Sequence, residues 1–132
     1  MDADIQRLIP QNKYDLAQVK SVIEMGYPKV APILPQLLEW LQDMNWPVAR
    51  PLASFLTTIG EPLIPHVVNI LRTDDHIWKY WVLSSVVSES SVMAKALSQE
   101  LERLANTPTK EECEEDLPEI AKDILEKIKA DK

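Results

Sequence analysis

Two histidines, one cysteine and a run of acids are the side chains that could bind a metal or carry out nucleophilic chemistry. His66 and His76 lie on different expected helices, and no cluster of cysteine, histidine and aspartate at metal-ligand spacing surrounds either one. Cys113 lies in the acidic run 111–116, where neighbouring carboxylates disfavour the thiolate that a nucleophile requires. We therefore expect a surface His66, a His76 at a helix start capped by an aspartate, no metal site and no catalytic cysteine.

Phosphate-binding and hydrolase motifs do not occur in the sequence. Gly26 and Gly60 are its only glycines, which is too few to build a glycine-rich phosphate loop. The sequence also has no nucleophile elbow and no zinc-protease signature. It therefore predicts a protein that is not an enzyme and that carries no cofactor.

Aromatic residues with basic neighbours form the pattern that most suggests a binding surface. We expect Trp46, Trp78 and Trp81 to cluster at neighbouring turns of the fold, with Arg50 and Lys79 close by. Tryptophans at such positions are more often part of a core, but partly exposed aromatic and basic surfaces are typical of binding hot spots. If the protein has a partner, these five residues are the predicted docking face.

The charge of the chain argues against nucleic acid as a partner. Fourteen lysines and arginines against 21 acids give a net charge of −7, so the general attraction that dominates nucleic-acid affinity is missing. The excess is greatest in residues 110–132, which carry nine acids and five lysines. The run from Glu111 to Asp116 could bind a partner or a cation, although the helix dipole by itself favours acids in a first turn.

A repeat of thirty residues organises the expected elements. Segment 32–41 matches segment 62–71 position by position, prolines included, and the apolar residues of both recur at helical spacing. The paired prolines predict tight, 3₁₀-like helix starts. Gly26 and Gly60 each follow an apolar stretch, as glycines that end helices do.

The same apolar period predicts about six to eight helices and no strand. Pro51 predicts a kink in the third helix. The last helix has two candidate starts, Thr107 and Thr109, of which the second makes a capping box with Glu112, and Pro118 predicts a division of this helix. A short turn is a candidate over residues 3–9. The expected helices cover residues 15–25, 31–43, 47–59, 62–73, 76–88, 91–105 and 110–130.

We interpret this pattern as one HEAT-like helical repeat domain over residues 1–132, an all-α protein folded as a short right-handed α-solenoid of helical hairpins. Stacked hairpins bury a continuous core, and the last helix should cap its C-terminal end. No apolar run approaches the roughly 18 residues that a membrane span needs, and the acidic start is unlike a secretory signal. We therefore expect a cytoplasmic protein without membrane contact.

Five stretches of the chain carry a family resemblance that runs nearly end to end. They are Leu8–Pro10 with Lys13–Asp15, Gly26–Leu41, Asn45–Ala49, Ile59–Pro65 and Asp74–Leu83. In these strings the sequence resembles a family of mostly bacterial proteins, domain of unknown function 5071, which looks like a relative of HEAT-repeat proteins. The resemblance implies a helical-repeat fold, and it implies no activity, ligand or catalytic residue.

The sequence therefore predicts a non-enzymatic interaction module, of the adaptor or toxin-neutralising type, that binds a protein or peptide on one face of a helical stack. The alternative is an enzyme or nucleic-acid-modifying HEAT-like protein, for which a basic groove would be the distinguishing feature. We expect an unidentified protein or peptide as partner, no nucleic acid, and a monomer or weak homodimer in solution.

Overall fold

The computed structural model describes residues 7–130, and within this range the regular secondary structure is all helical, with no strand. The candidate turn over residues 3–9 lies mostly outside the described residues. Four short 3₁₀-helices accompany the α-helices: η1 (Ala31–Ile33), η2 (Trp40–Gln42), η3 (Glu61–Leu63) and η4 (Val87–Glu89). The α-helices are α2 (Leu16–Met25), α3 (Leu34–Glu39), α4 (Ala49–Ile59), α5 (Ile64–Leu71), α6 (His76–Ser85), α7 (Ser91–Ala96), α8 (Ser98–Asn106), α9 (Lys110–Glu114) and α10 (Leu117–Ala130).

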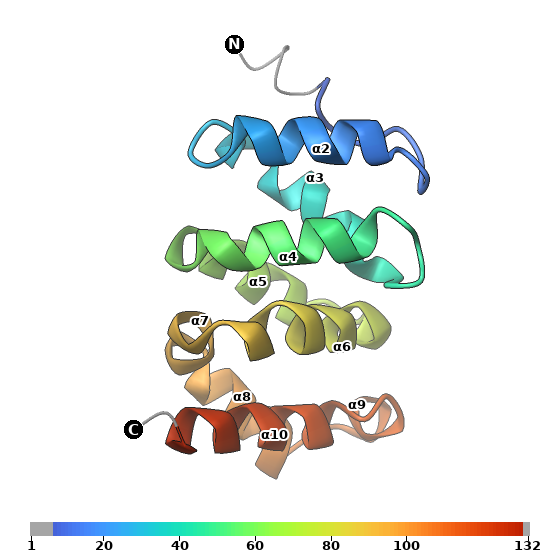
Figure 1. The fold of residues 1–132 in the computed structure, drawn as a ribbon. Coiled ribbons are helices and arrows are strands. Elements are labelled where there is room, and N and C mark those ends of the chain that lie inside the picture. The colour runs from blue at the N-terminus through green and yellow to red at the C-terminus, as the bar shows by residue number, and fades with distance from the viewer. Residues whose placement is uncertain (1–6, 131–132) are drawn as a thin grey trace.

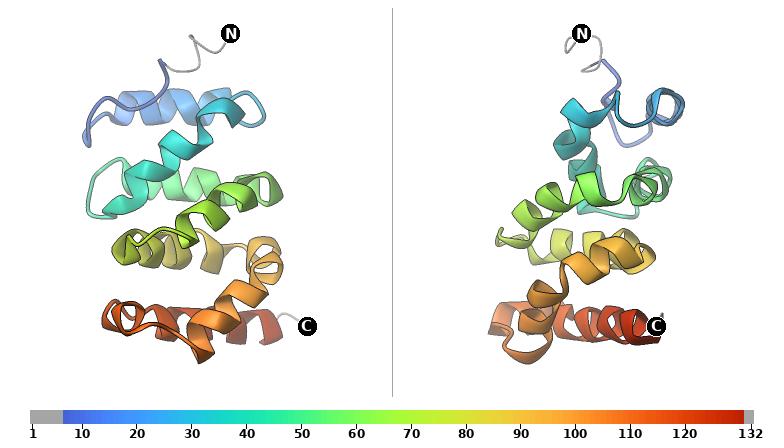
Figure 2. Two further views of the ribbon diagram at one scale, coloured as in Figure 1. Left: turned by 180° about the vertical axis from the view of Figure 1, so that it is seen from behind. Right: turned by 90° about the vertical axis from the view of Figure 1, so that its left-hand side faces the viewer.

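The helices form two layers (Figure 1). In one layer α2, α4, α6 and α10 follow one another in chain order, from one end of the molecule to the other. In the second layer α3, α5 and α8 lie behind them and connect each helix of the first layer to the next (Figure 2). This order makes α4 and α6 neighbours within the first layer.

The helix starts follow the proline pattern. The 3₁₀-helices η1 and η3 lead directly into α3 and α5, which confirms the predicted tight starts. Gly26 and Gly60 have φ angles of 73° and 77°, a region that other residues rarely adopt, and each follows the end of a helix. Pro51 is different, because α4 begins at Ala49 and so places Pro51 in its first turn. A proline there removes no backbone bond within the helix, and the reason for the predicted kink disappears.

Residues 7–130 contain nine α-helices, more than the six to eight predicted, because two expected helices are each divided in two. The segment 91–105 becomes α7 and α8, which meet at Leu97. The segment 110–130 becomes α9 and α10, and Asp116 between them has a φ angle of 60°. The second division confirms the prediction made from Pro118, which is the second residue of α10.

One apolar core runs between the two layers. Leu and Val side chains from both layers are fully buried in it, including Leu37 of α3, Leu52 of α4, Leu83 of α6 and Leu101 of α8. At the C-terminal end α10 buries Leu117, Ala121 and Ile124. None of the helices in the described range combines the length and the apolar character that crossing a bilayer requires.

Candidate partner-binding site

The five residues predicted as a docking face lie in four different environments. Arg50 and Trp81 line one pocket, between α4 and α6. Trp78 lines a second pocket, with residues of α3 and α5. Trp46 packs against another tryptophan, and Lys79 is buried. The structure therefore brings only Arg50 and Trp81 of the five together in one pocket.

Trp46 and Trp78 make contacts that support the fold. The Trp46 ring packs edge-on against the Trp40 ring, with centroids 5.6 Å apart and planes at 72°. The Trp78 indole Nε1 donates a hydrogen bond of 3.0 Å to the backbone carbonyl of Leu38. This bond joins α6 to α3 in the other layer. Both indoles are half-buried, so each combines packing with some exposed area.

Lys79 is 4% exposed, which corrects the expectation of a surface cation beside the tryptophans. Its Nζ lies 3.9 Å from Oε2 of Glu112, a carboxylate that is itself buried. The thirty-residue repeat contains a signal for this burial, because its register places Lys79 opposite Ala49, a core residue of α4. The charge of Lys79 predicts a surface position, whereas its position in the repeat predicts a buried one.

Glu112 is the buried centre of an ionic cluster that the sequence did not predict, in which Lys79 is also buried and Arg103 is partly exposed. Arg103 donates to it from both terminal nitrogens, Nη1 to Oε1 at 3.2 Å and Nη2 to Oε2 at 2.7 Å. The backbone N–H of Thr109 donates to Oε1 at 2.8 Å, and the Thr109 hydroxyl accepts from the N–H of Glu112 at 3.1 Å. The last two bonds form the capping box that the sequence predicted at the start of α9. The cluster thus ties α9 to α8 and α6.

The cluster shifts the acid–base equilibria of its members. Burial by itself raises the pKa of Glu112, but the hydrogen bonds from Arg103 and Thr109 and the positive charges of Arg103 and Lys79 outweigh it and lower the pKa to about 2. Burial also lowers the pKa of Lys79, an effect that Glu112 partly opposes. Glu112 is therefore ionised at neutral pH, and its negative charge pairs with Lys79 and Arg103.

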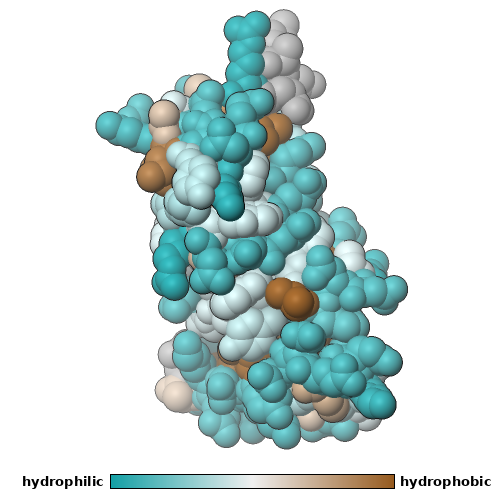
Figure 3. Space-filling view, turned by 90° about the vertical axis from the view of Figure 1, so that its right-hand side faces the viewer, coloured by the Kyte–Doolittle hydropathy of each residue, from teal (hydrophilic) through white to brown (hydrophobic). Residues whose placement is uncertain are grey.

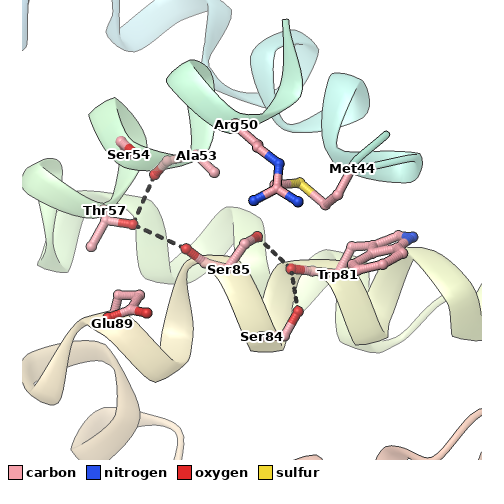
Figure 4. A pocket seen from close by; sticks show the side chains of 9 residues that line it. All are labelled: Met44, Arg50, Ala53, Ser54, Thr57, Trp81, Ser84, Ser85 and Glu89. Carbon is pink, nitrogen blue, oxygen red and sulfur yellow. Dashed lines mark hydrogen bonds between the residues drawn. The ribbon is translucent and has the colours of Figure 1, made fainter. Parts of the chain in front are cut away.

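We take the pocket between α4 and α6 as the candidate binding site, because it contains Arg50 and Trp81 together, and we call it the α4–α6 groove (Figure 4). It is open to solvent and has a volume of about 540 Å³. Its walls come from α4, from α6 with η4, and from the loop before α4. The lining residues are Met44, Arg50, Ala53, Ser54, Thr57, Trp81, Ser84, Ser85 and Glu89.

Arg50 is the cation of this groove. Its exposed side chain extends from α4 toward α6, and the guanidinium lies between the side chains of Met44 and Ser85 (Figure 4). Among residues 7–130 the only ion pairs are those of Glu112 with Lys79 and Arg103, so no described carboxylate neutralises Arg50. The guanidinium donors of Arg50 are therefore available to a ligand.

Three of the four hydroxyl groups that line the groove, those of Thr57, Ser84 and Ser85, donate their protons to the helix backbone. Thr57 Oγ1 donates to the carbonyl of Ala53 at 2.8 Å, and Ser84 Oγ donates to that of Trp81 at 3.3 Å. Ser85 Oγ donates to the same Trp81 carbonyl. Since a hydroxyl oxygen also carries two lone pairs, each can still accept a hydrogen bond from a ligand.

Comparison with known families adds one finding. The family model of domain of unknown function 5071 (DUF5071) matches residues 8–125 of the chain. The chain belongs to this family. No curated protein matches it. The match confirms the family resemblance drawn from the sequence.

His66, His76 and Cys113, the candidate metal ligands and nucleophile of the sequence, do not line the α4–α6 groove. Within the part of the chain that the structure describes, histidine, cysteine and acidic side chains nowhere form a group of three or more that could hold a metal ion. Cys113 is exposed, and the Asp75 carboxylate caps α6 by accepting from the N–H of Trp78 at 3.0 Å. The cap places His76 at the helix start, as predicted.

Hydrophobic residues form small, separated spots on the largely hydrophilic face of the molecule shown in Figure 3. Over the described residues, most of the large hydrophobic side chains that are exposed occur near α2, at the N-terminal end of the stack. They are Tyr14, Leu16, Ile23, Met25 and Tyr27. The α4–α6 groove differs from these positions because it combines a cation, an aromatic ring and hydrogen-bond acceptors in one concave site.

Proposed function

We propose that this DUF5071 protein is a non-enzymatic interaction module that holds a segment of another protein in the α4–α6 groove. We also propose that its fold is a short right-handed α-solenoid of HEAT-like hairpins, on the basis of the thirty-residue repeat and the two helical layers. Solenoids of this kind bind partners on extended surfaces formed by successive units. An adaptor and a toxin-neutralising protein both act in this way, by binding without chemistry.

The groove is the observation that carries the proposal. It places the unneutralised guanidinium of Arg50 and the half-buried indole of Trp81 on opposite walls of an open pocket. Arginine and tryptophan are the residue types that most often dominate protein interfaces, because each offers both apolar area and directed hydrogen bonds. With a net charge of −7, the chain favours a protein or peptide partner over nucleic acid or an anionic membrane. We propose a cytoplasmic monomer or weak homodimer as the binding form.

Site-specific crosslinking in living cells tests this function. Ser54 is exposed and lines the groove, so a photo-reactive benzoylphenylalanine at this position reports what occupies the site. The matched control carries the same group at Glu126, which is exposed on α10. We expect a discrete protein adduct from position 54 and none from position 126. We also expect Arg50→Glu to remove the adduct without changing the melting temperature, because exposed charges contribute little to stability.

The same experiment can reject the proposal. Equal crosslinking from positions 54 and 126 would show that the groove has no selective partner. A position-54 adduct that persists with Arg50→Glu would show that the partner does not bind through Arg50 in the groove.

A further inference from the structure

The walls of the α4–α6 groove are two parallel rows of side chains. Arg50, Ser54 and Thr57 follow one another at four- and three-residue spacing along one face of α4. Trp81, Ser85 and Glu89 follow at four-residue spacing along α6 and into η4. Seven residues of α-helix rise about 10 Å, so the row on α4 is about that long. An extended chain advances about 3.3 Å per residue, and the groove therefore accommodates about three residues of an extended peptide.

The two ends of the groove differ in charge. Arg50 and Trp81 lie at the end where α4 begins, and Thr57 and Glu89 lie at the other (Figure 4). Along the groove, the hydroxyls of Thr57, Ser84 and Ser85 have donated their protons to the backbone and offer lone pairs. The groove thus presents a donor at one end, acceptors along its length and a carboxylate at the far end.

We propose that the groove recognises an extended peptide segment whose carboxylate pairs with Arg50 and whose basic side chain, about three residues away, pairs with Glu89. This proposal rests on the proposed function and names the class of its ligand. The peptide N–H groups between the two charges donate to the hydroxyls of the groove. An apolar side chain next to the carboxylate packs on the indole of Trp81 and on Met44, which lie at the same end.

Charge complementarity is the reason for a carboxylate at this position. A protein of net charge −7 repels anions over most of its surface, and Arg50 is the only cation among the residues that line the groove. Arg50 is therefore a local exception that orients an anion on the surface. A guanidinium and a carboxylate form paired, charge-assisted hydrogen bonds, which give direction as well as affinity. The carboxylate can belong to an acidic side chain or to a chain terminus.

Selection from a randomised hexapeptide display library on the immobilised full-length protein tests the proposal. We expect the recovered peptides to share an acidic residue about three positions from a basic one. Each recovered sequence is then synthesised in three pairs: acidic residue against its amide, basic residue against a neutral one, and free against amidated C-terminus. Binding is measured by calorimetry to the unsubstituted protein, to Arg50→Gln, to Glu89→Gln and to Ser54→Trp, which fills the groove. Arg72→Gln is the matched control, because Arg72 is an exposed arginine on the other layer.

The proposal expects a loss of about tenfold to a hundredfold in affinity with Arg50→Gln, the range of one charge-assisted hydrogen-bonded pair. Removing the peptide carboxylate should cause the same loss and add nothing when Arg50 is already replaced. The peptide pair that shows this loss of affinity identifies whether the carboxylate belongs to a side chain or to the C-terminus. Glu89→Gln should weaken peptides with the basic residue and leave their neutral versions unchanged, and Arg72→Gln should bind like the unsubstituted protein.

Two other outcomes separate the proposal from the function on which it rests. Peptides that Ser54→Trp excludes, but that lack a carboxylate or bind Arg50→Gln equally well, would overturn the ligand class and leave the groove as a binding site. A library that yields no peptide, or only peptides that still bind Ser54→Trp, would overturn both.

Discussion

Glu112 shows how a single buried charge can hold separate helices together. Its carboxylate, 3% exposed, accepts hydrogen bonds from Arg103 and from the Thr109 backbone and lies 3.9 Å from Nζ of Lys79. Removing the charge would leave the ammonium of Lys79 buried without a counter-ion, a change that typically costs about 3 to 5 kcal/mol. Glu112 therefore stabilises the fold by compensating the charge of Lys79 as well as through its own hydrogen bonds.

The free energy of unfolding should depend on pH through Glu112. Its pKa is about 2 in the folded protein against 4.5 for the unperturbed group, so the ionised form favours folding. This contribution, about 3 kcal/mol, is complete above pH 4.5 and is lost as the pH falls toward 2. Urea denaturation from pH 7 to pH 2 should show the unsubstituted protein losing more stability than Glu112→Gln, so that the two curves converge in acid. Glu111→Gln, at an exposed neighbour, is the control. Parallel curves for Glu112→Gln and the unsubstituted protein would contradict the assignment.

Lys79 makes a weaker contribution to the same cluster. It is buried, its pKa is lowered by that burial, and its distance to Glu112 exceeds that of the Arg103 bond. We therefore expect Lys79→Met to leave the free energy of unfolding unchanged or to raise it by about 1 kcal/mol, since an apolar side chain of similar length avoids desolvating a charge. Arg103→Met should instead lower it by about 3 kcal/mol, because Glu112 loses both side-chain hydrogen bonds. Chemical denaturation at pH 7 measures both, and equal losses would show that Lys79 matters as much as Arg103.

Between elements, the junction of α9 and α10 contains a strained residue. Asp116 has a φ angle of 60°, a region in which a side chain is disfavoured and glycine is not. Asp116 is also exposed, so its replacement removes no buried contact. We expect Asp116→Gly to raise the free energy of unfolding by up to about 1 kcal/mol. Thermal unfolding of Asp116→Gly and of Glu115→Gly distinguishes the cause, because Glu115 has a φ angle of −102° and glycine should destabilise it.

The α4–α6 groove depends on the packing of two helices, because neither α4 nor α6 forms it alone. One row is Arg50, Ser54 and Thr57 on α4, and the other is Trp81, Ser85 and Glu89 on α6 and η4. The two rows face each other only because the helices are neighbours in one layer. Arg50 extends across the space between them. On either helix alone, these residues would form an ordinary solvent-exposed face.

For the molecule as a whole, α10 closes one end of the stack. It buries Leu117, Ala121 and Ile124, and its contacts with α6, α7 and α8 cover the core at that end. Deleting residues 107–132 would expose this surface and would also remove Glu112 from the buried ammonium of Lys79. We expect the truncated protein to aggregate, as shown by light scattering coupled to gel filtration. A truncated chain that stays monomeric and equally resistant to heat would contradict the capping role of α10.

The sequence by itself determined the helical elements and the family. The apolar residues recur at a local spacing of three and four, and the prolines, the two glycines and the Thr109–Glu112 capping box act within a few residues of their own positions. These local signals were sufficient to locate the helices and most of their ends. The count of helices was too low. Pro118 indicated the division at Asp116, but Leu97 carries no strong local signal for the division of segment 91–105.

Only the tertiary structure decided which charged and aromatic residues are buried and which partners they contact. Lys79 and Glu112 are 33 positions apart in the chain, and Trp78 and Leu38 are 40 apart, so no local spacing could pair them. Five residues that composition grouped as one docking face were divided among a tryptophan pair, an inter-layer hydrogen bond, a buried ion cluster and the groove. Burial of a charge depends on whether a distant partner arrives to compensate it, and that is a property of the stacked helices rather than of any segment.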